Sequence, residues 1–283
     1  MYYQLMIDTH AHLNFPEFKN CLPETIAECQ KAGVTGAIIA SSNLADSRRA
    51  VALAQKYPGF LWTAVGLHPQ NTAPEDPLPI KEQLLRLENL LSDSLSTPVG
   101  CNENPAHPSG VIAVGECGLD YSPAPPGEAD RSREEQHLIL NHQLELALKY
   151  DLPLLLHSRK VGDELIAIVR DHPQAAKLRG VFHCYSGGKK RIAKILDLPG
   201  EWYFGVDGNI TYDEGVQIVT QLIPRDRLLL ETDAPFLAPE PHRGETNTPA
   251  YLPLIAAQVA EIWQSSVEEV AAQTLTNTHC LFF

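Results

Sequence analysis

The stretch "MIDTHAHLNF" (residues 6–15) joins a short apolar segment to two histidines, His10 and His12. In an extended strand, residues i and i+2 point to the same side, so both imidazoles are expected to project together where the strand ends. Such a pair often arises by chance and is weak evidence for a metal when it stands alone. Its meaning therefore depends on which other side chains the fold brings to the same place.

Seven further segments share the apolar, β-branched character of this strand and end in polar or Gly/Pro-rich turns. The eight predicted strands are YYQLMID (2–8), TGAIIAS (35–41), FLWTAVG (60–66), VIAVGE (111–116), LPLLLH (152–157), RGVFHC (179–184), EWYFGVD (201–207) and DRLLLETD (226–233). Strands that are apolar on both faces are typical of parallel sheets covered by helices.

Amphipathic stretches lie between the strands and predict helices. Examples are ETIAECQKA (24–32), KEQLLRLENLL (81–91), REEQHLILNHQLELALKY (133–150) and DELIAIVRDH (163–172). Ser132 with Glu135, and Ser266 with Glu269, have the spacing of capping boxes, which mark helix starts. Eight strand–helix repeats favour a closed TIM (β/α)8 barrel over an open doubly wound sheet. We expect one domain over residues 1–283, with the Pro-rich segments 73–79, 96–110 and 122–130 as loops.

Composition limits the possible functions. The chain has 283 residues, is 44% hydrophobic and carries a net charge of −13, which argues against a broad polyanion-binding surface. Its apolar runs fall short of the roughly 20 residues that a membrane span needs, and its N-terminus lacks a secretory signal pattern. The six cysteines lack C-x-x-C spacing and are interpreted as reduced thiols. These features predict a cytoplasmic protein that does not act at a membrane.

Metal-capable side chains fall at the carboxyl ends of five predicted strands, where a barrel keeps its chemistry. They are His10, His12, Glu116, His157, His183 and Asp233. Each alone has an ordinary explanation: an ion-paired carboxylate for Glu116, satisfied histidines, and for Asp233 a cap of the turn before Pro235. Their joint occurrence at one end of the barrel favours a metal site.

Six ligands exceed the three or four that one catalytic transition metal takes from a protein. They suit two divalent ions that share a bridging carboxylate and activate a water. Imidazole nitrogens favour zinc, manganese or iron over magnesium or calcium. Among the first three metals the sequence does not decide.

Seven motifs together resemble the TatD-type metal-dependent deoxyribonucleases of the amidohydrolase superfamily. In chain order they are DTHAHL, VGLHP, AVGECGLDY, LPLLLHSR, FHCYSG, ETDAPFLAP and PHRG. The resemblance runs from near residue 6 to the C-terminus. It implies a metal-bearing TIM barrel that hydrolyses phosphodiester bonds, often from a 3′ end.

The resemblance also implies roles for individual residues. One ion is expected on His10, His12 and Asp233, and the other on His157 and His183, with Glu116 bridging. Asp233 and Glu116 are the expected catalytic carboxylates, and Asp233 also accepts the proton of the attacking water.

Further positions that match the family's motifs, or lie beside them, have expected roles outside the ligand set. His68, Arg159 and Arg243 are expected to contact substrate phosphates, and Asp120 to orient a metal ligand. The stretch "GETNTP" (244–249) is acidic and neutral where a basic segment is expected, which weakens any grip on nucleic acid.

Three functions stay open at this point. The first is a two-metal deoxyribonuclease acting exonucleolytically on single-stranded or frayed DNA ends. The second is an amidohydrolase-type hydrolase of a small ester, lactone or amide, including an aminoacyl ester on tRNA. A non-catalytic metal-binding module ranks last, because all six ligand positions are filled. No obligate protein partner is indicated.

Overall fold

The structure is a computed structural model that describes residues 5–70, 78–96, 109–123 and 130–283. The predicted loops 73–79, 96–110 and 122–130 lie mostly outside the described residues. Within the described ranges, no helix has both the length and the apolar character needed to cross a bilayer.

All eight predicted strands are present, and they follow one another in the sheet in sequence order, as in a (β/α)8 barrel. They are β1 (Met6–Ala11), β2 (Val34–Ile39), β3 (Leu61–Val65), β4 (Val111–Asp120), β5 (Leu154–Arg159), β6 (Arg179–Phe182), β7 (Glu201–Val206) and β8 (Leu228–Leu230). The predicted fold class is confirmed. Strands β1 and β4 are buried along their whole length, as expected for strands covered on both faces.

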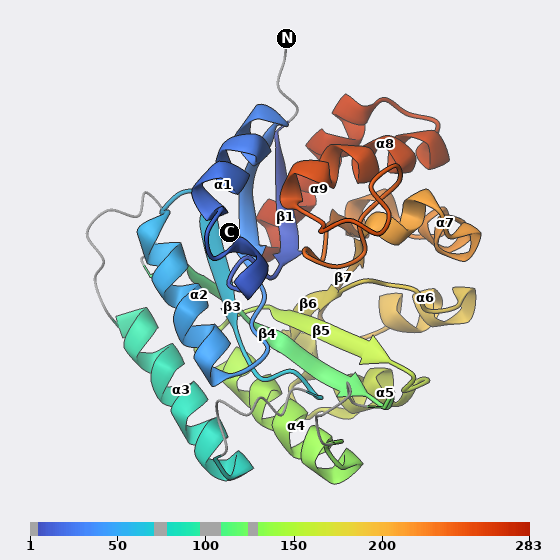
Figure 1. Ribbon diagram of the computed structural model, residues 1–283. Coiled ribbons are helices and arrows are strands. Elements are labelled where there is room, and N and C mark those ends of the chain that lie inside the picture. The colour runs from blue at the N-terminus through green and yellow to red at the C-terminus, as the bar shows by residue number, and fades with distance from the viewer. Residues whose placement is uncertain (1–4, 71–77, 97–108, 124–129) are drawn as a thin grey trace. The chain divides into compact units, whose positions relative to one another are not determined.

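Helices alternate with the strands (Figure 1). They are α1 (Leu22–Lys31), α2 (Leu44–Lys56), α3 (Ile80–Ser96), α4 (Arg133–Tyr150), α5 (Glu164–Asp171), α6 (Lys189–Leu196), α7 (Glu214–Thr220), α8 (Leu252–Trp263) and α9 (Val267–Phe282). Short 3₁₀ turns are η1 (Pro16–Phe18), η2 (Ala175–Lys177), η3 (Gly208–Thr211), η4 (Arg225–Arg227) and η5 (Pro249–Tyr251). Both predicted capping boxes are confirmed, at the starts of α4 and α9.

Two compact units divide the chain. Unit 1 comprises residues Met1–Ile39, His183–Leu196 and Tyr203–Phe283, and unit 2 comprises Ala40–Phe182 and Asp197–Trp202. Unit 1 contains β1, β2, β8 and most of β7, and its last two helices, α8 and α9, pack side by side. Unit 2 contains β3 to β6, and its helices α2, α3 and α4 lie in a row (Figure 1). That residues 1–283 act as one domain stays a prediction.

Within each unit, backbone pairing brings strand ends together. In unit 1 the segment after β8 continues along β1: Asp233 N–H donates to His10 O at 2.9 Å, and His12 N–H donates to Ala234 O at 2.7 Å. In unit 2, Gly118 of β4 pairs with His157 of β5. Gly118 has φ +147°, and a Cβ there would lie 2.0 Å from the His157 carbonyl oxygen, so only glycine permits this approach.

Candidate metal centres

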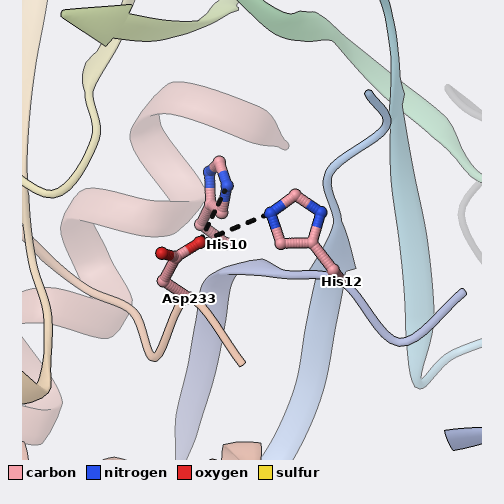
Figure 2. Close-up of side chains that lie close together, drawn as sticks. All are labelled: His10, His12 and Asp233. Carbon is pink, nitrogen blue, oxygen red and sulfur yellow. Dashed lines mark ion pairs between the residues drawn. The ribbon is translucent and has the colours of Figure 1, made fainter. Parts of the chain in front are cut away.

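The first group of metal-capable side chains, the β1/β8 cluster, consists of His10, His12 and Asp233 in unit 1. Figure 2 shows both imidazoles turned toward the Asp233 carboxylate. Its Oδ1 lies 3.6 Å from His10 Nε2 and 3.4 Å from His12 Nε2. The side chains are buried or nearly so, so that the three donor atoms face one another in a region that water reaches poorly.

These spacings fit a bound divalent ion. Ligand bonds of about 2.1 Å in a tetrahedral zinc site place neighbouring donor atoms about 3.4 Å apart. The two separations in the β1/β8 cluster are 3.4 and 3.6 Å, longer than a hydrogen bond and close to that value. Two imidazole nitrogens and one carboxylate oxygen are a donor set that transition metals accept.

The loop after β8 holds Asp233 in an uncommon backbone conformation. Asp233 has φ +55°, in the left-handed region. Asn247 secures this loop, because its side-chain amide donates to Thr232 O at 2.8 Å and to Phe236 O at 2.6 Å. Asn247 is fully buried and belongs to the "GETNTP" stretch. At least this residue of the stretch therefore supports the turn that carries Asp233.

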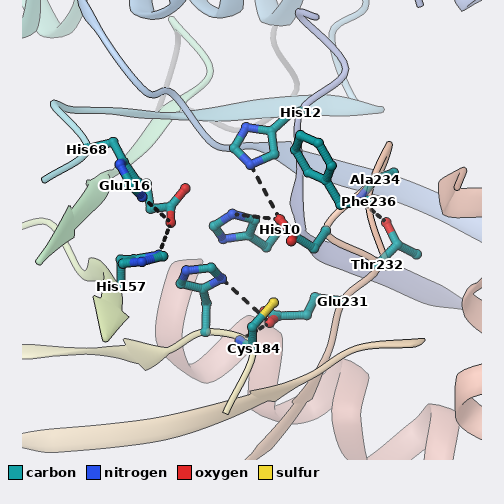
Figure 3. A network of polar contacts seen from close by, with 12 residues as sticks. His10, His12, His68, Glu116, His157, Cys184, Glu231, Thr232, Ala234 and Phe236 are labelled. Carbon is teal, nitrogen blue, oxygen red and sulfur yellow. Dashed lines mark hydrogen bonds and ion pairs between the residues drawn. The ribbon is translucent and has the colours of Figure 1, made fainter. Parts of the chain in front are cut away.

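His183 also lies in unit 1, directly after β6. Its ring stacks on the His10 ring, with centroids 4.1 Å apart and an interplanar angle of 7°. The nearby Glu231 carboxylate is fully buried and accepts a hydrogen bond from the Cys184 N–H (Figure 3). The structure thus brings His183 to the β1/β8 cluster.

The second group, the β4/β5 cluster, consists of His68, Glu116 and His157 in unit 2. Glu116 Oε1 lies 2.7 Å from His157 Nδ1 and 3.6 Å from His68 Nε2 (Figure 3). The shorter distance is that of a hydrogen bond, so a proton lies between Glu116 and His157 in this arrangement. Replacing that proton by a divalent ion would keep both donors in place.

Asp120 lies at the other end of the His157 ring from Glu116. Its Oδ2 is 3.4 Å from His157 Nε2, while its Oδ1 accepts the Ser122 N–H at 2.8 Å. Burial disfavours a charged His157, but hydrogen bonds to Asp120 and Glu116 outweigh it and raise the pKa of His157 to about 9. Burial likewise opposes the charged form of Asp120, yet its hydrogen bonds with His157 and Ser122 lower the pKa of Asp120 to about 2.

The tautomer of His68 limits what this residue can do. Its Nδ1 accepts a hydrogen bond from the Gln70 N–H at 3.0 Å. A neutral imidazole whose Nδ1 is an acceptor carries its proton on Nε2, which makes Nε2 a donor and not a ligand. His68 therefore stands beside the possible metal ligands as a hydrogen-bond donor.

The two arginines of the predicted site lie in different units. Arg159 ends β5 with an exposed side chain. Arg243 lies on the surface of unit 1, with its guanidinium 4.1 Å from the centre of the Tyr212 ring. Each is exposed and can meet a phosphate.

Several buried acids were not assigned a role from the sequence. Burial raises the pKa of Asp8 to about 7 and that of Asp207 to about 6, and it raises the pKa of Glu231 well above its usual value. All three lie in or directly after otherwise apolar strands of unit 1. A carboxylate in or next to an apolar strand is the one sequence signal that could have pointed to these residues. Each carboxylate contacts at least one group that lies far from it in the sequence, so the sequence did not suggest a role.

Known proteins resemble the chain over its whole length. The family model described as "TatD related DNase" matches residues 7–283. The "Uncharacterized metal-dependent hydrolase YabD" of Bacillus subtilis is 30% identical over 281 residues, which cover 98% of this chain and 99% of the relative. The "3′-5′ ssDNA/RNA exonuclease TatD" of Erwinia tasmaniensis is 31% identical over 285 residues, with coverage of 98% and 99%.

A solved structure supports the same family relationship. The crystal structure of YJJV, a TatD homologue from Escherichia coli K12, superposes with a TM-score of 0.83 and 31% identity and covers 100% of this chain and 99% of that one. This likeness supports the (β/α)8 fold along the whole sequence. The chain belongs to the TatD related DNase family and is a metal-dependent hydrolase of that family.

Proposed function

We propose that this chain is a two-metal phosphodiesterase that removes nucleotides from single-stranded or frayed DNA ends. The observation that carries the proposal is that the β1/β8 cluster and the β4/β5 cluster are among the groups of side chains that could hold a metal ion in the described residues. One ion belongs on His10, His12 and Asp233. From the family resemblance, His157 and His183 would hold the second ion and Glu116 would serve both ions, whereas the structure places the His183 ring against His10.

Zinc, manganese or iron suits these donors better than magnesium or calcium, because most of the donors are imidazole nitrogens. When bound, such ions lower the pKa of a coordinated water and offset the negative charge that develops on the phosphate. Proton transfer, phosphate binding and the positioning of the ligands are carried out by the protein's own side chains.

Asp233 is the residue that moves the proton. One oxygen belongs to the ligand set, and the other can accept the proton of the attacking water. The water oxygen then forms a new P–O bond, the P–O bond to the remaining strand breaks, and the departing oxygen of that strand takes up a proton from solvent. General-base assistance of this kind contributes about 10²–10⁴ in rate.

Phosphate binding falls to His68, Arg159 and Arg243. His68 presents an Nε2 proton beside Glu116, which suits a hydrogen bond to a phosphate oxygen. Arg159 and Arg243 are exposed and offer guanidinium groups, which match phosphate geometry. Asp120 holds the His157 ring in position, as carboxylates beside metal-bound histidines do.

The preference for strand ends follows from charge. A net charge of −13 is poorly suited to a broad duplex-binding groove, whereas two ions and a few cationic side chains suffice for one terminal nucleotide. The Erwinia relative's name specifies 3′-5′ action on single-stranded DNA and RNA, which supports attack from the 3′ end. We further propose that residues 1–283 work as one cytoplasmic domain without an obligate protein partner.

The test combines metal analysis with digestion. Purified protein is assayed for zinc, manganese and iron, and its dominant metal is then used with single strands labelled at either the 3′ or the 5′ end. Loss of the 3′ label first, with slower attack on a blunt duplex, is the expected result. His12→Ala should abolish digestion, and the surface variant His279→Ala is the matched control. Hydrolysis of a lactone or small ester without any digestion of the strand would overturn the proposal.

A further inference from the structure

Asp8 is a buried carboxylate that the proposed reaction does not use. It lies in β1, two residues before His10. Asp8 has no solvent exposure. Burying a carboxylate costs folding free energy unless hydrogen-bond donors surround it, so the identity of the donors around Asp8 indicates what it supports.

Those donors come from the two segments that carry the β1/β8 cluster. Asp8 Oδ1 accepts the His10 N–H at 3.1 Å and the Thr232 N–H at 3.0 Å. Its Oδ2 accepts the Thr232 hydroxyl at 2.5 Å. One carboxylate therefore ties the backbone at His10 to the residue directly before Asp233.

The Thr232 hydroxyl extends the link on the other side. While donating to Asp8, it accepts the Ala234 N–H at 3.2 Å, so it spans the backbone on both sides of Asp233. Hydrogen bonds thus hold the backbone N–H groups of Thr232 and Ala234, the residues on either side of Asp233, and the Asp233 N–H itself donates to His10 O. These contacts restrict how far the Asp233 carboxylate can move from the two histidines.

We infer that Asp8 and Thr232 form a positioning pair that sets the metal affinity of the β1/β8 cluster. The inference rests on the proposed function only in taking His10, His12 and Asp233 as metal ligands. The spacings of 3.4 and 3.6 Å in that cluster suit an ion, and a shift of several tenths of an ångström in Asp233 would weaken the fit. Neither Asp8 nor Thr232 belongs to the proposed ligand set, so both act through Asp233 and His10.

Substitutions separate this role from simple packing. In Asp8→Asn the amide NH₂ faces the Thr232 hydroxyl, which must then give up its role as donor. Thr232→Val keeps the side-chain shape and removes the hydroxyl, whereas Thr232→Ser restores it. Residues that support metal ligands typically contribute 10- to 100-fold in metal affinity, so Asp8→Asn and Thr232→Val should weaken one ion by about that factor.

Thr9 provides a matched control. Its hydroxyl also joins the two segments, donating to Leu230 O at 3.1 Å from a fully buried position. It contacts neither His10 nor Thr232 through that bond. Thr9→Val should therefore lower the unfolding temperature of the metal-free protein as Thr232→Val does, with metal affinity within about twofold of the wild type.

The experiment uses the full chain. Zinc affinity is measured by competition with a chromophoric chelator, and the visible absorption of the cobalt-loaded protein reports ligand geometry. Asp8→Asn and Thr232→Val are expected to weaken one ion 10- to 100-fold and to alter the cobalt spectrum, with Thr232→Ser close to wild type. Wild-type affinity in both variants, or an equal loss in Thr9→Val, would overturn the inference.

A His10→Ala variant separates this inference from the proposed function. If His10→Ala loses an ion while Asp8→Asn keeps it with normal affinity, only the positioning role is wrong. If His10→Ala keeps every ion of the wild type, the metal assignment itself is wrong and the positioning role falls with it.

Discussion

Replacing Asp233 by asparagine separates its chemical role from its structural one. Asp233 has φ +55°, a conformation that asparagine tolerates and alanine does not. Asparagine also keeps one oxygen near His10 and His12, which lie 3.6 and 3.4 Å from the present Oδ1. Asp233→Asn should therefore fold normally, while Asp233→Ala should lose about 1–2 kcal/mol of unfolding free energy to backbone strain.

The catalytic loss should be much larger than the structural one. An amide cannot accept a proton at neutral pH, so kcat is expected to fall by about 10²–10⁴, or about 3–5 kcal/mol in activation free energy. The assay is single-turnover digestion of an end-labelled single strand at saturating metal. Asp151→Asn is the matched control, because Asp151 also has a positive φ, of 52°. Wild-type turnover in Asp233→Asn would refute the proton-transfer role, and recovery with excess metal would leave Asp233 as a ligand only.

Three further outcomes follow from the contacts of single residues. Asn247→Ala leaves the buried Thr232 carbonyl and the partly buried Phe236 carbonyl without their donor, so it should lower the unfolding free energy by about 1–3 kcal/mol and weaken one metal ion. Asn277→Ala, which removes a similar pair of bonds, should lower stability alone, as chelator competition and urea unfolding will show. Arg159→Ala should raise KM for a single strand without loss of metal and reduce the salt slope of log Kd by about 0.7; metal loss in this variant would show that Arg159 is structural. In metal-free protein, the pKa of His157 is raised from 6.5 to about 9, so its ion pairing stabilises the fold fully below pH 6.5 and is lost as pH rises through 9. Urea unfolding should show a decline on the order of 1–3 kcal/mol over that range that His157→Gln lacks, and parallel pH curves would contradict this.

Much of the fold was predictable because its signals are local. The alternation of apolar strands and amphipathic helices depends on residues within one element, and α4 spans the predicted residues 133–150. The capping boxes that begin α4 and α9 involve positions only three residues apart. The bounds of the first strand were less well predicted: the pattern placed it at residues 2–8, whereas β1 is Met6–Ala11 and includes His10.

The supporting contacts of the site were not predictable in this way. Asp8 and Thr232 are separated by 224 residues, and no local pattern announces that they are hydrogen-bonded. Asn247 looked like part of a surface segment that bears on nucleic-acid affinity, yet it is buried beneath the Asp233 turn. Such pairs arise only when the fold brings distant strand ends together, so the sequence pattern does not predict them.

The most direct test of two-metal catalysis is a stoichiometric titration of activity. Metal-stripped protein is loaded with zinc or manganese in steps, and release of the terminal nucleotide from a 3′-labelled single strand is measured at each step. The account predicts little release at one equivalent and full activity at two equivalents per chain. Full activity at a single equivalent, or no release at any loading, would contradict it.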